Sequence, residues 1–146
     1  MRQALAEAMK AFELDEVPIG CIIVQDGRLI AKGHNLTEQL KDATAHAEMM
    51  AITAASAALE SRYLTGTTLY ATIEPCPMCA GAIVLARIPL LVFGAYDIKA
   101  GACGTLYNIP QDNRLNHQVK IIPGILDQEC ASLMQEYFRK HRVPKV

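Results

Sequence analysis

Several features that define common protein classes are scarce or missing in this chain. It has no tryptophan, only 5% aromatic residues and a formal net charge of −1. A net charge this small excludes binding to nucleic acid through overall charge alone. No apolar run approaches the ~20 residues that cross a bilayer, and charged residues interrupt the N-terminal segment. We therefore expect neither a membrane span nor a signal peptide.

The composition is that of one folded domain. Of the 146 residues, 51% are hydrophobic and 20% are charged, which argues against disorder. The length suffices for a sizeable core, and no repeat or low-complexity segment divides it, so we expect a single domain over residues 1–146. We expect a cytoplasmic location, where free thiols persist. An odd number of cysteines, five, then favours metal binding plus buried thiols over a disulfide framework.

The hydrophobic pattern alternates between helical and strand periodicity. The first two predicted strands are joined by Asp26-Gly27, a pair typical of a two-residue hairpin, and later strands with helical crossovers should run parallel. This order predicts an α/β fold with three layers, α/β/α, around a central mixed five-stranded sheet. The expected helices are 2–13, 44–61, 78–87 and 127–141, with a helical turn at 106–109; the expected strands are 19–25, 28–33, 67–73, 90–94 and 119–122.

One constellation carries the chemistry of the chain. An H-x-E motif supplies His46 and Glu48, and a later P-C-x-x-C motif supplies Cys76 and Cys79. One imidazole and two thiolates are suitable zinc ligands, and three protein ligands leave a fourth position that water can fill. An open position indicates a catalytic site, with the carboxylate of Glu48 beside it as a proton carrier.

The spacing within each motif places both ligand sets at helix N-termini. His46 and Glu48 are about 200° apart around a helix, so they converge only in its first turn; Thr44 is a suitable N-cap for such a helix. Cys76 and Cys79 are neighbours on a helical turn, and Pro77 suits a first helical position. The positive end of a helix favours thiolate over thiol, as zinc ligation requires.

Three alternatives to this site remain open. Cys76 and Cys79 could form a thioredoxin-like redox pair, although H-x-E would then be idle. A closed structural zinc site would need a fourth ligand, with candidates in His34, His117, His141 or another cysteine. Glu48 could be an exposed helical residue, but its apolar neighbours indicate burial, which would raise its pKa toward the range useful for proton transfer.

These motifs resemble those of the zinc-dependent nucleobase deaminases, whose signature is H-x-E with P-C-x-x-C. Outer motifs resemble the bacterial branch of that family that acts on tRNA adenosine: E-V-P-I-G at 16–20, G-H-N at 33–35, V-F-G-A-Y-D at 92–97, L-N-H at 115–117 and E-Y-F-R-K at 136–140. The resemblance covers nearly the whole chain. It implies a cytidine deaminase-like fold and hydrolysis of the wobble adenosine of a tRNA anticodon loop to inosine, with release of ammonia.

The resemblance also assigns residues. His46, Cys76 and Cys79 would hold one zinc ion per chain, and Glu48 would carry protons from the activated water to adenine N1 and to the departing ammonia. Asn35 and Asn116 would contact the flipped nucleotide, and Asp97 the neighbouring anticodon backbone. An Asn amide can both donate and accept hydrogen bonds. The alternative for all three polar residues is that they cap loops.

The C-terminal segment combines aromatic and basic residues. Tyr137, Phe138 and Arg139, followed by Lys140, Arg142 and Lys145, could bind a single-stranded loop by stacking and phosphate neutralisation. The alternative is an amphipathic helix whose Leu133, Tyr137 and Phe138 pack on the sheet while its charges face water.

Two residues depart from the family pattern, and one family property concerns assembly. Tyr96 stands where many members carry a basic residue, and Ala43 stands where proline is usual. The family forms homodimers in which both subunits shape the RNA site, and Ala80-Gly81-Ala82 could allow close helix packing at such an interface.

Two further functions compete: a deaminase of a free base or nucleoside (guanine, cytosine or cytidine), and a non-catalytic RNA-binding subunit, against which Glu48 argues.

Overall fold

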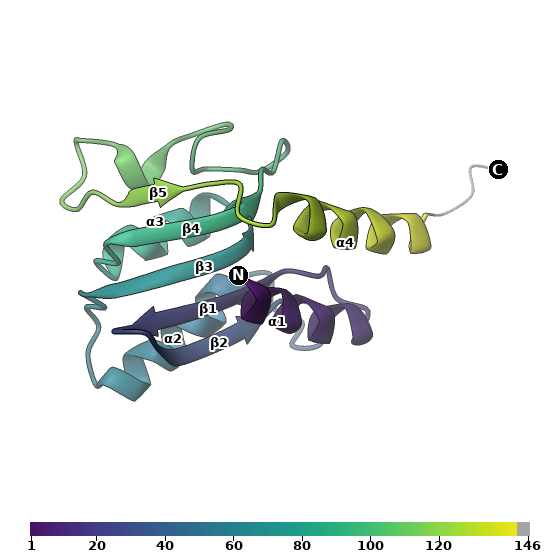
Figure 1. Ribbon diagram of the computed structural model, residues 1–146, viewed down its shortest axis with the longest axis horizontal. Helices are drawn as coiled ribbons and strands as arrows, with labels where there is room; N and C mark the ends of the chain where they lie inside the picture. Colours follow the sequence, from purple (N-terminus) through teal and green to yellow (C-terminus); the bar gives the residue numbers. More distant parts are fainter. Residues whose placement is uncertain (143–146) are drawn as a thin grey trace.

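A five-stranded mixed sheet forms the centre of the molecule in the computed structural model, which describes residues 1–142 (Figure 1). Its order is β2-β1-β3-β4-β5. β1 pairs antiparallel with β2 and with β3, whereas β3, β4 and β5 are parallel. The predicted mixed sheet is therefore confirmed. The strands are β1 (Gly20–Gln25), β2 (Arg28–His34), β3 (Thr67–Ile73), β4 (Leu90–Ala95) and β5 (Lys120–Ile122).

Helices cover both faces of this sheet, as the three-layer prediction requires. α2 and α3 lie on one face, and α1 and α4 lie on the other (Figure 1). None of the helices within residues 1–142 is long and apolar enough to cross a membrane. The helices are α1 (Arg2–Glu13), α2 (Ala47–Leu59), α3 (Pro77–Leu85) and α4 (Asp127–Lys140), with a 3-10 turn at Ile109–Gln111.

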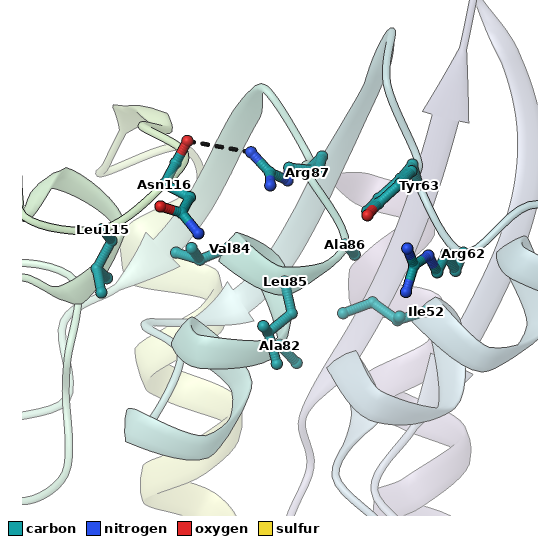
Figure 2. A pocket seen from close by; sticks show the side chains of 10 residues that line it. All are labelled: Ile52, Arg62, Tyr63, Ala82, Val84, Leu85, Ala86, Arg87, Leu115 and Asn116. Atoms are coloured by element: carbon teal, nitrogen blue, oxygen red, sulfur yellow. Dashed lines mark hydrogen bonds between the residues drawn. The ribbon is translucent and has the colours of Figure 1, made fainter.

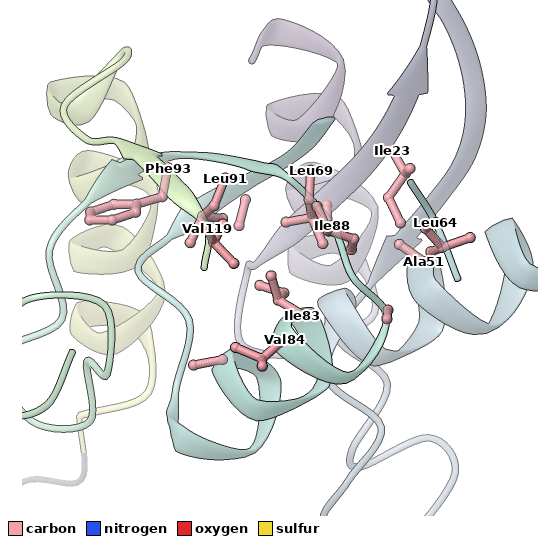
Figure 3. Close-up of a cluster of buried hydrophobic side chains, with 14 of the residues drawn as sticks. Ile23, Ala51, Leu64, Leu69, Ile83, Val84, Ile88, Leu91, Phe93 and Val119 are labelled. Carbon is pink, nitrogen blue, oxygen red and sulfur yellow. The ribbon is translucent and has the colours of Figure 1, made fainter. Parts of the chain in front are cut away.

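The main core lies between the sheet and the layer formed by α2 and α3. Leu69, Leu91 and Phe93 of the strands belong to one buried cluster with Ile83 of α3, and all four are fully buried (Figure 3). Alternate residues of β4 face opposite layers, so Gly94 instead faces α4, where a Cβ atom would lie 2.5 Å from the Cys130 sulfur. This alternation fixes which side of the sheet carries the metal-ligand helices.

Most predicted elements occur where the pattern placed them, and two details were wrong. Thr44 does not cap α2, because its N–H and hydroxyl both donate to Asp42 Oδ1, at 2.8 and 2.7 Å. The helix begins instead at Ala47 with His46 as its N-cap. The helical turn expected at 106–109 lies at Ile109–Gln111, where Pro110 occupies its first turn. Asp26 and Gly27 both have positive φ, 50° and 74°, as the predicted hairpin turn requires.

Candidate metal and proton-transfer site

The first residues of α2 and α3 meet just beyond the C-terminal end of β3. His46 is the N-cap of α2 and Cys76 is the N-cap of α3, both with extended backbone conformation. Pro77 takes the first position of α3, as predicted, and Cys79 is the third residue of that helix. Both ligand sets therefore lie at helix N-termini, although α2 begins at Ala47, later than an N-cap at Thr44 would place it.

The three predicted ligands come together. His46 Nδ1 lies 3.5 Å from Cys76 Sγ and 3.6 Å from Cys79 Sγ, and the three ligand atoms lie within 4.8 Å of one another. A tetrahedral ion with zinc–nitrogen and zinc–sulfur distances of about 2.0 and 2.3 Å holds such atoms about 3.6 Å apart. The donor set and its spacing thus fit zinc. Over residues 1–142 the group contains no fourth ligand, so the closed structural site finds no support there.

Electrostatics at the two cysteines favour a thiolate at Cys76. The hydrogen bond from the Cys79 thiol, together with the nearby His46, lowers the pKa of Cys76 to about 4. The pKa of Cys79 is correspondingly raised, first because it donates that hydrogen bond and second because it is buried. Cys76 is therefore a thiolate at neutral pH, the protonation state that binds metal. The Cys76 thiolate in turn raises the pKa of His46.

Glu48 is buried beside this group. Glu48 is only 3% exposed, and its Oε1 atom has no hydrogen-bond partner in the described part of the chain. Burial raises the pKa of the Glu48 carboxyl above its ordinary value. An unpartnered buried acceptor costs roughly 1–3 kcal/mol, so this arrangement opposes stability. A buried carboxyl with a raised pKa next to a group of metal ligands is a candidate for proton transfer.

Asn35 and Asp97 lie on loops, and their side chains cap those loops. Asn35 is 5% exposed; its Nδ2 donates to the Val17 carbonyl and its Oδ1 accepts from the Thr37 N–H, both at 3.3 Å. Asp97 Oδ1 accepts from the N–H groups of Lys99 and Ala100, at 3.0 and 3.1 Å. Both side chains thus cap loops, which was the alternative to substrate binding, and their contact with a nucleotide stays a prediction.

Asn116 lies near the C-terminal end of α3, and its contact with a nucleotide stays a prediction. Its carbonyl accepts a hydrogen bond of 3.0 Å from Arg87 Nη1, beyond the C-terminal end of α3 (Figure 2). Cys76 caps the opposite end of that helix, whose nine residues span about 13 Å. Asn116 instead lines a pocket of about 540 Å³ with Tyr63 and Leu85.

The aromatic residues of α4 differ in exposure. Tyr137 is buried: its hydroxyl donates to the Asp15 carbonyl at 3.3 Å, and its ring stacks on His141 with centroids 4.1 Å apart. Phe138 is 53% exposed, and Arg139 is exposed beside it. Packing thus explains Tyr137, while Phe138 and Arg139 remain accessible. Of the basic residues predicted here, Lys145 lies outside the described residues.

Sequence reasoning assigned no role to two buried carboxylates that hold loops. Glu16 is 0% exposed and Glu74 is 2% exposed. Each accepts several hydrogen bonds from one loop: Glu16 from residues 37–39 and Glu74 from residues 97–105. Glu16 opens the motif at 16–20 and Glu74 directly precedes Pro75-Cys76, but neither position reveals the partner of its carboxylate.

Comparisons with known proteins agree with this geometry. A model of MafB19-like deaminases matches residues 1–142. The tRNA-specific adenosine deaminase of Bacillus subtilis (strain 168) is 49% identical over 145 residues, covering 99% of this chain and 90% of that protein. The enzyme of the same description from Aquifex aeolicus (strain VF5) is 48% identical, covering 97% and 93%. A structure solved in a study of A-to-I editing by tRNA:A34 deaminases at the wobble position matches with a TM-score of 0.88 and 44% identity, covering 91% and 96%.

Proposed function

Because this chain belongs to the MafB19-like deaminases and aligns over nearly its whole length with tRNA-specific adenosine deaminases, we propose that it converts the wobble adenosine of a tRNA anticodon loop to inosine. The observation that carries the proposal is the cluster of His46, Cys76 and Cys79 with the buried Glu48 beside it, whose Oε1 atom has no hydrogen-bond partner among residues 1–142. The reaction consumes one water and releases one ammonia.

The chain's own residues would divide the chemistry between them. His46, Cys76 and Cys79 would hold one zinc ion per chain, which when bound lowers the pKa of water to near neutral. Glu48 would take a proton from the attacking water and deliver it to N1 of adenine. It would then deliver the second proton of that water to the departing amine. Burial of Glu48 keeps bulk water away from both transfers.

Substrate contacts are proposed for the loops and for α4. Asn35 and Asp97 would orient the flipped nucleotide and its neighbour, and Phe138 and Arg139 would stack on the anticodon loop and neutralise phosphate. Support comes from the exposure of Phe138 and Arg139. Tyr137 would contribute indirectly, since its packing on Asp15 fixes α4. The position of Asn116 offers no support for contact within the same chain.

We also propose that the protein is a homodimer, as the family resemblance implies. Ala80 is buried in the core, so only Gly81 and Ala82 of the predicted packing motif are available to a second copy. Among residues 1–142, no atom outside the backbone of α3 itself lies within 4 Å of a Cβ position on Gly81, and Leu85, one turn further along α3, is 77% exposed. Sedimentation should show a dimer that Leu85→Glu dissociates; a wild-type monomer would contradict this proposal.

The remaining proposals concern extent and location. One continuous sheet and core support a single catalytic domain over residues 1–146. Five free cysteines, two of them proposed as zinc ligands, support a cytoplasmic location, because thiols persist in that compartment.

Ammonia release tests the proposed activity. Total tRNA, adenosine, cytidine, cytosine and guanine are incubated separately with the zinc-loaded protein. We expect ammonia from tRNA alone, with inosine appearing in the digested product. Ammonia from a free base or nucleoside, without inosine in tRNA, would instead establish the alternative activity. No ammonia from any substrate would support the non-catalytic alternative.

A further inference from the structure

A buried carboxylate directly precedes the metal-ligand turn. Glu74 is 2% exposed, and no Lys, Arg or His of residues 1–142 forms an ion pair with it. Its partners all come from the loop after β4. Oε1 accepts from the N–H of Asp97 at 3.0 Å and from the hydroxyl of Thr105 at 2.5 Å, and Oε2 accepts from the N–H groups of Cys103 and Thr105 at 3.0 and 3.1 Å.

The loop closes directly around this carboxylate. A Cβ atom on Gly101 would lie 2.3 Å from Glu74 Cδ and 2.4 and 2.5 Å from its two oxygens. The Gly101 N–H also donates to the Asp97 carbonyl at 2.9 Å. Glycine is therefore the residue that lets the backbone pass over the carboxylate, and the four hydrogen bonds hold the loop there.

The same short stretch of chain carries the loop and a metal ligand. Glu74 is followed by Pro75, whose carbonyl accepts from the Ala102 N–H at 2.9 Å, and then by the ligand Cys76. On its outer side the loop presents exposed Tyr96, Ile98 and Lys99. Glu74 is thus the point at which these side chains are fixed relative to the metal group.

We propose that Glu74 is a positioning residue that sets the loop of residues 97–105 against the metal-ligand turn, so that the loop's outer side chains meet RNA next to the reacting base. The part of this inference that concerns RNA rests on the proposed function. Loss of the carboxylate frees the loop but leaves the metal ligands and Glu48 in place. The consequence is weaker tRNA binding with little change in the chemical step, because the loop supplies no group that transfers a proton.

Two variants separate this role from general destabilisation. Glu74→Gln keeps the size of the side chain, but its amide nitrogen cannot accept the hydrogen bonds of one carboxylate oxygen. Thr105→Val removes a single donor to Glu74, and Thr105→Ser restores it. Thr67→Val is the matched control: Thr67 is 1% exposed, and its hydroxyl donates to the Leu64 carbonyl at 2.6 Å at the opposite end of β3.

The test combines amide hydrogen exchange, zinc content and steady-state kinetics on tRNA. In Glu74→Gln we expect exchange at residues 97, 103 and 105 to rise at least about tenfold, one zinc per chain, and a KM raised about tenfold with kcat within about twofold. Thr105→Val should show a smaller change of the same kind, Thr105→Ser should reverse it, and Thr67→Val should show neither effect.

Other outcomes would overturn the inference. Unchanged loop exchange in both Glu74→Gln and Thr105→Val would show that the carboxylate does not hold the loop. Loss of zinc, or a lower kcat at unchanged KM, would place Glu74 in the metal chemistry instead. If Glu74→Gln does not fold, Thr105→Val decides. If the wild-type protein does not act on tRNA, the proposed function fails, while exchange and zinc content still test the anchoring.

Discussion

Gly33 of β2 lies directly against the first turn of α2: a Cβ atom on residue 33 would come 2.5 Å from the Ala47 carbonyl oxygen and 2.8 Å from the Ala51 nitrogen. This contact sets how closely the helix that follows His46 approaches the sheet. Gly33→Ala should therefore lower the free energy of unfolding by about 1–3 kcal/mol, the usual cost of overpacking. Urea denaturation of the zinc-loaded protein measures the change.

Gly81→Ala provides the control for that substitution. Gly81 is helical, and its Cβ position meets no atom within 4 Å, so helix propensity should raise the free energy of unfolding by up to about 1 kcal/mol. Because Gly81 lies on the face proposed to pack against a second copy, both variants are made and compared in the Leu85→Glu background, where the dimer is expected to be absent. An equal effect of the two substitutions would show that the contact between Gly33 and Ala47 carries no special cost.

Metal content should separate ligand cysteines from buried ones. Cys79→Ser removes a ligand of the group around His46, and bound zinc should fall from about one per chain to below about a tenth after dialysis. Cys103 is equally buried and donates to the Pro75 carbonyl at 3.8 Å, yet it does not belong to the group. Cys103→Ser should retain zinc; loss of metal in this variant would mean that the ligand set is misassigned.

Glu48 should be needed for activity but not for folding. Glu48→Gln cannot carry a proton, and kcat should fall by about 10²–10⁴, the usual contribution of general acid–base catalysis. Zinc should remain bound. Because Glu48 Oε1 is buried and has no partner in the part of the chain that the structure describes, thermal denaturation should show an unchanged or higher Tm. A clear fall in Tm would indicate that this carboxyl has a structural role that its contacts do not reveal.

Glu16 should stabilise the loop that carries Asn35. It is 0% exposed and accepts from the Gln39 N–H at 2.6 Å and the Glu38 N–H at 3.2 Å. Glu16→Gln should lower the free energy of unfolding by roughly 1–3 kcal/mol, since buried donors lose their acceptor. Glu13→Gln, at an exposed position of α1, is the control and should change stability by less than about 0.5 kcal/mol.

Periodicity predicted the strands of the sheet, the order of the elements and the bounds of most helices, because burial repeats along the sequence. Local side-chain bonds were harder to foresee. Thr44 has a side chain suited to an N-cap, but its hydroxyl donates to Asp42 instead, and α2 begins three residues later, at Ala47. Motif spacing was enough to predict the ligands His46, Cys76 and Cys79, because each ligand set lies within a few residues at the start of one helix.

Long-range contacts explain the rest. The partners of Glu74 lie 23 to 31 positions away, so its role depends on how β3 and β4 pair in three dimensions. The position of Asn116 likewise depends on where the loop before β5 meets Arg87, just after α3. No periodic signal encodes such contacts, and the residues meant to bind substrate were therefore the least predictable.

The most direct test of the account is the position of inosine in tRNA after treatment with the purified protein. Inosine reads as guanosine when the RNA is copied, so sequencing of treated total tRNA shows each converted adenosine. Wild-type protein should convert the anticodon wobble adenosine and no other adenosine. At equal zinc content, Glu48→Gln should leave the wobble adenosine unconverted. Conversion at other adenosines, equal conversion by Glu48→Gln, or no conversion at the wobble position would contradict the account.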